Sequence, residues 1–147
     1  MFPAQRMAHL AGKAAAGFIL ALALVLPGCS AAEGFSQIDY GKSELYTRED
    51  LDQGIEMIEE AMKEWKGVDL QGIRYGSDED SSPENIQWMN ELDPAGGGYR
   101  EVMRFYTDFH TQPDVSPSLN PDSDYTYSWW LGRTDDGSWK ILTFGQG

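Results

Sequence analysis

Three residues in the middle of the chain carry side chains that could perform acid–base chemistry. Asp108 lies two residues before His110, and Arg104 lies four residues before Asp108. Alternate residues of a β-strand point to the same face, so in a strand these three side chains would share one face. An Asp–His pair can act as a general acid and base, and a guanidinium can stabilise developing negative charge. Asp108, His110 and Arg104 are therefore the candidate catalytic residues.

A structural role for His110 has stronger support than a catalytic one. It is the single histidine after residue 28, which excludes histidine pairs and helix-borne histidine metal motifs from that part of the chain. A histidine at the solvent-exposed end of an edge strand, with no second titrating partner, is far commoner than a catalytic histidine. We therefore expect a protein that is not an enzyme, with an enzyme that uses Asp108 and His110 as the alternative.

One stretch partly matches a calcium-binding loop. Asn120, Asp122 and Asp124 alternate as the first ligands of such a loop do. Tyr125, however, stands where the loop needs glycine, and Leu131 stands where the bidentate glutamate belongs. The stretch therefore does not predict a calcium site.

The remaining candidates for metal or redox chemistry are also weak. Asp78, Glu79 and Asp80 could form a loose cation site, but acidic residues at a turn more simply keep that turn soluble. Cys29 is the only cysteine, so neither a disulfide nor a cysteine-based zinc site nor a redox pair is available within the chain. We predict no metal and no cofactor.

One long helix is predicted early in the chain, over residues 48–66. Thr47 is a candidate N-cap with Asp50 three residues later, and Gly67 is a stop signal. Apolar residues recur every three or four positions along the segment, which indicates one buried face. These residues are Leu51, Ile55, Ile58, Met62 and Trp65.

The rest of the chain predicts about four strands and a second, short helix. Strands are expected at 68–76, 99–110, 124–133 and 138–145, from alternation and from β-branched or aromatic residues. Ser82 followed by Pro83 predicts a helix over 83–92. The fold class is therefore α+β, with the long helix packed on a curved, mainly antiparallel sheet.

The last two strands are expected to form a hairpin with apolar residues on both faces. Gly137 favours a type I turn followed by a bulge, which sets the register of the two strands. One predicted face carries Tyr127, Trp129, Leu131, Trp139 and Ile141, and the other carries Trp130, Leu142 and Phe144. A single helix covers only one face of such a sheet, so the other face must be covered differently or open as a cleft.

Aromatic residues on these strands are the candidate ligand-binding residues. An aromatic-lined cleft would use Tyr75, Phe105, Trp129, Trp130 and Trp139. Adjacent Trp129 and Trp130 could also form a platform for a sugar or a peptide. Adjacent aromatic residues on opposite faces of a strand nevertheless more often fill two halves of a core.

The N-terminal segment has the layout of an export signal. Arg6 and Lys13 precede a 13-residue apolar stretch, residues 14–26, which is shorter than the roughly 20 residues of a membrane-spanning helix. The run Leu26-Pro27-Gly28-Cys29 resembles a bacterial lipoprotein signal, in which cleavage precedes a cysteine that carries lipid. The resemblance implies a signal peptide over 1–28, lipidation of Cys29, and attachment to the extracytoplasmic face of the bacterial cell membrane.

Composition limits the partners of the part that follows the signal. After residue 28 the chain has 9 basic and 24 acidic residues, a net charge of −15. Nucleic acid is recognised through basic patches and is therefore excluded as a partner. The same charge argues against a domain that lies flat on anionic lipid. We expect a flexible tether over residues 29–43 and a single domain over 44–147.

Three stretches carry a further resemblance, at residues 46–52, 88–92 and 129–140. They resemble a family of small bacterial lipoproteins with no established activity. The helix and the final hairpin are also similar to the nuclear-transport-factor-2-like and cystatin-like folds, in which a curved sheet wraps a long helix. The resemblance implies fold and location and carries over no site residue.

These observations favour a lipid-anchored module of the cell envelope that binds a small ligand or another envelope protein. One alternative is the enzyme with Asp108 and His110 already described. A second alternative is an adaptor that contacts other proteins through its acidic surface.

Overall fold

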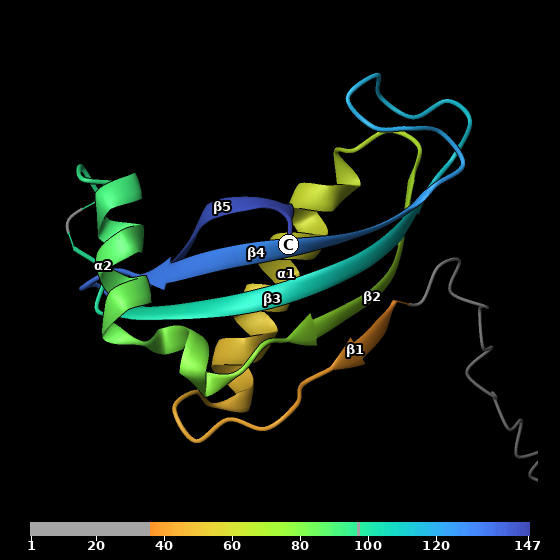
Figure 1. Cartoon of the computed structure of the whole chain (residues 1–147). Helices are drawn as coiled ribbons and strands as arrows, with labels where there is room; N and C mark the ends of the chain where they lie inside the picture. Colours follow the sequence, from red (N-terminus) through yellow and green to blue (C-terminus); the bar gives the residue numbers. More distant parts are fainter. Residues whose placement is uncertain (1–35, 97) are drawn as a thin grey trace, which may run out of the picture. The chain divides into compact units, whose positions relative to one another are not determined.

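A computed structural model describes residues 36–96 and 98–147 of the chain (Figure 1). The predicted signal peptide, Cys29 and residues 30–35 of the predicted tether lie outside the described residues. The fold is α+β, with two α-helices and one five-stranded sheet. The elements are β1 (Gln37–Asp39), α1 (Arg48–Lys63), β2 (Val68–Tyr75), the 3₁₀ helix η1 (Asp78–Ser81), α2 (Pro83–Leu92), β3 (Glu101–Thr111), β4 (Asp124–Arg133) and β5 (Trp139–Gln146).

The sheet contains one strand more than the sequence predicts. The strands lie in the order β1 to β5, with β1 parallel to β2 and all other pairs antiparallel. The extra strand, β1, falls inside the segment predicted as a flexible tether. All three of its residues are exposed, so the strand is held by main-chain hydrogen bonds to β2. The sequence did not predict it because a strand held in this way needs no alternation of apolar and polar residues.

Asp78 attaches the chain after β1 to the body of the domain. Its carboxylate accepts hydrogen bonds from the Ser43 hydroxyl, from the Glu44 backbone N–H at 2.7 Å and from the Tyr75 hydroxyl at 2.9 Å. Burial alone would raise the pKa of Asp78, but these hydrogen bonds to the charged form outweigh burial and lower the pKa. Residues 36–43 of the predicted tether are therefore part of the fold.

Helix α1 begins where the sequence predicts and ends earlier. The Thr47 hydroxyl accepts from the Asp50 N–H at 3.2 Å and the Asp50 carboxylate accepts from the Thr47 N–H at 3.0 Å, which confirms the capping box. The last helical residue is Lys63 rather than residue 66. Trp65 therefore leaves the helical stripe, and Gly67 follows with a φ of +71°, the left-handed backbone that favours glycine.

The face of the sheet that α1 covers holds the main core. Four of the five predicted stripe residues are buried against it, namely Leu51, Ile55, Ile58 and Met62. The opposing side chains come from β2, β3, β4 and β5, and they include Ile73, Tyr75, Met103, Phe105, Phe109, Trp129, Leu131 and Trp139. In Figure 1 the helix crosses behind the strands, and the opposite face of the sheet points to the viewer.

Two irregularities in the strand pairing decide which side chains reach this core. The register shifts between Leu70 and Gly72 in β2, and opposite the Trp130–Leu131 step of β4. The second shift places Phe144 against Trp129, with ring centroids 4.5 Å apart. The predicted position of Phe144 beside Trp130 is therefore wrong, because a bulge moves each later residue of a strand to the other face.

The final hairpin has the predicted turn. The Gly137 N–H donates to the Thr134 carbonyl at 3.0 Å, and the Thr134 N–H donates to the Ser138 carbonyl at 2.9 Å. Gly137 has a φ of +86°. These features confirm a type I turn followed by a glycine bulge.

Helix α2 covers one end of the opposite sheet face. It spans Pro83–Leu92 as predicted, and the Ser82 hydroxyl caps it by accepting from the Asn85 N–H at 3.2 Å. A second, smaller core lies beneath it, made of Met89, Val102, Trp130, Ile86 and Leu142. The 3₁₀ helix η1 also packs against β3, and the rest of that sheet face carries no α-helix among the described residues.

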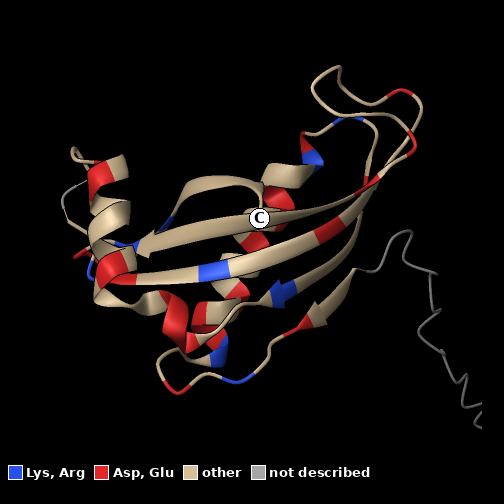
Figure 2. Ribbon diagram, in the orientation of Figure 1, with Lys and Arg blue, Asp and Glu red and all other residues tan. Residues whose placement is uncertain are grey.

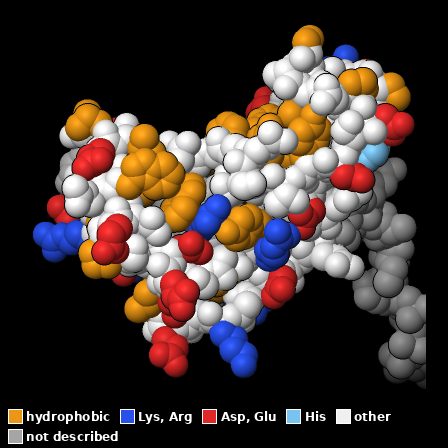
Figure 3. All heavy atoms as spheres, viewed as in Figure 1, with side chains coloured by type: hydrophobic (Ala, Val, Ile, Leu, Met, Phe, Trp, Pro, Cys, Tyr) orange, Lys and Arg blue, Asp and Glu red, His pale blue; other side chains and the backbone are white. Residues whose placement is uncertain are grey.

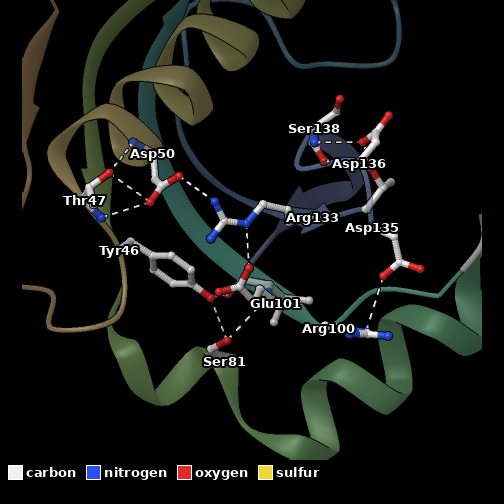
Figure 4. A network of polar contacts seen from close by, with 12 residues as sticks. Tyr46, Thr47, Asp50, Ser81, Arg100, Glu101, Arg133, Asp135, Asp136 and Ser138 are labelled. Atoms are coloured by element: carbon white, nitrogen blue, oxygen red, sulfur yellow. Dashed lines mark hydrogen bonds and ion pairs between the residues drawn. The ribbon is translucent and has the colours of Figure 1, made fainter.

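A polar network joins the start of α1 to the middle strands (Figure 4). Arg133 donates to Asp50 at 2.8 Å and to Glu101 at 2.6 Å, so it links α1, β3 and β4. The Tyr46 hydroxyl donates to the Val102 carbonyl at 2.8 Å, and burial raises the pKa of this tyrosine. The donors and acceptors of this network are hydrogen-bonded to one another. We therefore assign the network a structural role, which is to hold the start of α1 against β3 and β4.

Gly54 lets α1 approach β3 closely, which predicts the effect of a substitution. A Cβ at this position would lie 2.7 Å from Phe105 and 3.3 Å from Met103. In an exposed helix, Gly→Ala stabilises by about 1 kcal/mol, but overpacking a core costs about 1–3 kcal/mol. We expect Gly54→Ala to lower the free energy of unfolding by about 1 kcal/mol in urea denaturation. Gln53→Ala, on the exposed side of the same helix, should not lower it. A Gly54→Ala variant more stable than the natural chain would contradict this packing.

Candidate functional site

A groove opens where α1 ends, between the turn after the helix, the loop of residues 112–123 and the strands β4 and β5. Its volume is about 670 Å³. The lining residues are Glu64, Trp65, Lys66, Val68, Ser116, Ser118, Leu119, Tyr127 and Phe144. We call this site the aromatic groove. Figure 1 places the 112–123 loop and the C-terminal end of α1 at the same end of the sheet.

Stacked rings form the floor of the aromatic groove. Trp65 stacks on the buried Trp129 at 5.5 Å between centroids, and its ring centroid is 5.4 Å from that of Phe144. Tyr127 contacts Trp65 edge-on at 6.0 Å. Phe144 is 48% exposed, so one ring of this cluster stays accessible to a ligand. Because neighbouring rings hold each other in place, the apolar surface is preformed.

The loop that forms the other wall is held by specific contacts. The Gln112 N–H donates to the Gly67 carbonyl at 2.7 Å. The Thr111 hydroxyl donates to the Asn120 carbonyl at 2.6 Å, and the Asn120 N–H donates to the Tyr125 hydroxyl at 2.9 Å. A Cβ on Gly67 would lie 2.8 Å from the Val115 backbone. Gly67 therefore allows the close contact between the helix end and the loop.

Polar groups lie at the rim rather than on the floor. Lys66 Nζ is 3.6 Å from Asp114, in an exposed ion pair. The hydroxyls of Ser116 and Ser118 lie 3.3 Å from each other. Exposed pairs of this kind contribute little binding energy. The arrangement suits an apolar chain or ring with a polar end at the rim.

The structure brings the three candidate catalytic residues to one face of β3, where each of them has other partners. Asp108 pairs with Arg74 and accepts from the Thr126 hydroxyl at 2.6 Å. Arg104 lies 3.7 Å from Asp80. The face that carries them is opposite α1 and the aromatic groove. Asp108 therefore has Arg74 and Thr126, rather than His110, as its hydrogen-bond partners.

His110 instead holds the end of the 112–123 loop. Its Nδ1 lies 2.8 Å from Asp124 and its Nε2 lies 3.1 Å from Asp122. The hydrogen bond with Asp124 is the main cause that raises the pKa of His110, and Asp122 adds to it. Asp122 has a φ of +50°. Two residues of the stretch that only partly matched a calcium loop, Asp122 and Asp124, thus contact His110.

The five aromatic residues predicted to line a cleft are buried. Tyr75, Phe105, Trp129, Trp130 and Trp139 are all at most 7% exposed. Trp129 and Trp130 point to opposite faces and fill the two separate cores. They therefore do not form an accessible platform, although Trp129 supports the floor of the aromatic groove from below.

Sequence reasoning missed the residues that do line a groove, for two different reasons. Trp65 lies on the predicted apolar stripe of α1, which gave no sign that the helix ends before it. Phe144 was placed on the wrong face because the bulge in β5 is not visible as a pattern. The 112–123 loop supplies Leu119, an isolated apolar residue among prolines and serines. That residue was the one available signal of a loop that packs on the core.

Two of the three acidic residues weighed as cation ligands, Asp78 and Asp80, have protein partners. Asp78 is bound by Ser43, Glu44 and Tyr75, and Asp80 accepts from the Ser77 N–H at 3.0 Å. Within residues 36–96 and 98–147, no group of three or more His, Cys, Asp or Glu side chains is arranged to hold a metal ion. In the same residues, no helix has the length and apolarity to cross a membrane.

Comparison with known protein families, curated proteins and solved structures finds no match to this chain. The functional argument therefore depends on the geometry of the groove and on the sequence features of the N-terminal segment.

The wall of the aromatic groove is tested by two glycine substitutions with the same backbone constraint. Gly67 and Gly137 have φ values of +71° and +86°, but only Gly67 lies against other atoms. Alanine in this backbone region costs about 1 kcal/mol by itself, and a backbone clash adds about 1–3 kcal/mol. We expect Gly67→Ala to lower the free energy of unfolding by at least about 2 kcal/mol and Gly137→Ala by about 1 kcal/mol. Equal losses in urea denaturation would contradict the close packing of helix end and loop.

Proposed function

We propose that this protein is a lipid-anchored binding module on the extracytoplasmic face of the bacterial cell membrane. Its aromatic groove holds an uncharged, apolar group of a small ligand or of an envelope protein. The observation that carries the proposal is the preformed cluster of Trp65, Tyr127 and Phe144, which leaves an apolar ring accessible beside an open volume.

The anchor part of the proposal is supported by the sequence before the described residues. The run Leu26-Pro27-Gly28-Cys29 follows a short apolar stretch, and its resemblance to a lipoprotein signal favours lipid on Cys29. Two acyl chains hold a protein stably on a bilayer, whereas one gives only marginal binding. The acidic domain, which carries Asp and Glu over both helices and several loops (Figure 2), contributes no electrostatic attraction to anionic lipid.

The size and lining of the aromatic groove support ligand binding. Pockets for small molecules typically enclose about 300–1,000 Å³ and are lined mainly by apolar and aromatic side chains. The groove falls inside this range at about 670 Å³. Its few polar groups lie at the rim, where they can orient a ligand without a large desolvation cost.

The chemistry of the lining favours an uncharged occupant. The floor is aromatic, and Val68 and Leu119 add aliphatic surface. Glu64 and Lys66 lie at the same rim with opposite charges, so the rim attracts neither sign strongly. A buried charge without a partner on this floor would be costly.

A fluorescent apolar probe tests the aromatic groove. N-phenyl-1-naphthylamine is neutral and brightens in apolar surroundings, so its fluorescence reports binding to the full-length protein as a bacterial host processes it. Phe144 and Leu92 are equally exposed, at 48% each, but only Phe144 lines the groove. Removing a half-exposed phenyl ring from the site makes the free energy of probe binding less favourable by about 1–2 kcal/mol. We therefore expect Phe144→Ser to weaken probe binding about tenfold.

Leu92→Ser is the matched control and should bind the probe as the natural chain does. Circular dichroism and urea denaturation establish that both variants remain folded. Equal probe binding by Phe144→Ser and the natural chain would contradict the proposed site. An equal loss of probe affinity in Phe144→Ser and Leu92→Ser would also contradict it.

The anchor is tested separately through Cys29. We expect a bacterial host that is fed an alkyne-tagged palmitate to label the natural protein and to retain it in the membrane fraction. Cys29→Ser should lose the label and leave that fraction, because no thiol remains to carry the lipid. Labelling of the serine variant to the same extent would contradict lipidation at Cys29.

A further inference from the structure

The sheet face opposite α1 carries a row of alternating cationic and aromatic side chains. The guanidinium carbon of Arg104 lies 4.6 Å from the ring centroid of Tyr106 and 4.9 Å from that of Trp130. Arg74 lies 4.9 Å from the same Tyr106 ring. Figure 3 views this face, where basic side chains lie between hydrophobic ones. Each arginine of the row has a carboxylate beside it, Asp108 next to Arg74 and Asp80 next to Arg104.

The strand register produces this row. Tyr106 on β3 is paired with Arg74 on β2, and Arg104 on β3 is paired with Trp130 on β4. Arg104 and Tyr106 are two residues apart on one strand and so share a face. Trp88 on α2, which is 42% exposed, contacts Trp130 edge-on at 5.5 Å and extends the row. The side chains are held by regular pairing rather than by a loop.

Arg104 differs from the other arginines of the core strands in its hydrogen bonding. Arg133 donates to two carboxylates at 2.6 and 2.8 Å, and Arg74 donates to Asp108. The Nε of Arg104 is buried without a hydrogen-bond partner among the described residues. Its Nη1 lies 3.7 Å from Asp80, which is beyond hydrogen-bond distance. A largely buried guanidinium with unused donors is costly.

The neighbouring side chains hold Arg104 ready for a ligand. Two aromatic rings fix the plane of the guanidinium, so little side-chain entropy is lost on binding. The side chain is 24% exposed, which leaves part of it accessible to solvent. Asp80 accepts from the Ser77 N–H with Oδ2, and its Oδ1 forms the long ion pair with Arg104. Asp108 is bound by Arg74 and Thr126. Arg104 therefore keeps a buried Nε–H that makes no hydrogen bond among the described residues, while its Nη1 is ion-paired with Asp80 and Gly147 lies beside its Nη2.

We propose that Arg104, held between Tyr106 and Trp130, binds the carboxylate of a singly charged ligand on the sheet face opposite the aromatic groove. A planar carboxylate matches the planar fork of a guanidinium. A phosphate group would bring a charge of about −1.5 to −2 next to Asp80 and Asp108, in a chain of net charge −13. The ligand is a free small carboxylic acid or the C-terminal carboxylate of a peptide.

This site is independent of the proposed function, because its residues do not line the aromatic groove. An experiment can therefore show that the aromatic groove binds a ligand and Arg104 does not, or the reverse.

The Nε–H of Arg104 is a local reporter of carboxylate binding. Because it is buried, it exchanges slowly with water and gives its own signal in a proton–nitrogen correlation spectrum, assigned by its loss in Arg104→Lys. We titrate the full-length protein with acetate, with triglycine and with triglycine amide, each against sodium chloride at matched ionic strength. We expect a saturable shift with acetate and triglycine and none with the amide. Binding of triglycine at least tenfold tighter than acetate assigns a peptide end, and equal binding assigns a small acid.

Variants separate this site from general electrostatics. For Arg104→Lys, the shift of the Trp130 indole signal reports binding, and we expect at least tenfold weaker affinity because lysine lacks the planar pair of donors. Arg100→Lys, at an exposed ion pair with Asp135, is the matched control and should bind as the natural chain does. Asp80→Asn keeps an oxygen that can accept from Ser77 and removes a repelling charge. It should tighten acetate binding about threefold to fivefold.

Three results would overturn the proposal. One is a shift that rises linearly with acetate and matches that of sodium chloride. Another is equal binding of triglycine and its amide. The third is unchanged acetate affinity in both Arg104→Lys and Asp80→Asn, since this would place the carboxylate elsewhere.

Discussion

The fold depends on the stacking of aromatic rings at the point where α1 stops. Trp129 is fully buried, and both Trp65 and Phe144 stack on it, at 5.5 and 4.5 Å between ring centroids. Trp65 reaches this position only because the helix ends at Lys63 and the chain turns through Gly67. Phe144 reaches it only because a bulge shifts the register of β5. The end of the helix, the face that β5 presents and the position of the groove are therefore linked through contacts with one buried indole.

Local sequence signals predicted much of the fold, because each acts over a few residues. Thr47 and Asp50 marked the start of α1, Ser82 and Pro83 marked α2, and Gly137 marked the hairpin turn. Features that depend on distant contacts were not predictable. The strand β1 is defined by main-chain pairing with β2, and the bulges are defined by packing across the sheet. The aromatic groove was missed for the same reason, since it arises where three distant segments meet.

The two faces of the sheet serve different chemistry because different elements cover them. The face beneath α1 is mainly apolar, with a polar network around Arg133 at one end and aromatic rings lining its open end. The opposite face is covered by α2 at one end and contacted by η1 along β3, which leaves charged and aromatic residues of β2 and β3 partly accessible. Arg104 illustrates the consequence, since its alternation with Tyr106 along β3 sets it between two rings, and its one carboxylate neighbour, Asp80, is too far for a hydrogen bond. Of the three residues singled out for catalysis, Asp108 and His110 have structural partners, and Arg104 retains binding capacity.

The most direct measurement of the central claim is the position of an apolar ligand on the full-length protein. Intermolecular nuclear Overhauser effects between N-phenyl-1-naphthylamine and isotope-labelled protein report contacts within about 5 Å, a separation typical of neighbouring aromatic rings. Our account predicts contacts from the probe to Trp65, Phe144 and the Leu119 methyl groups, which line one groove. Contacts confined to Trp88 and Leu92, or an absence of contacts at saturating probe, would contradict it.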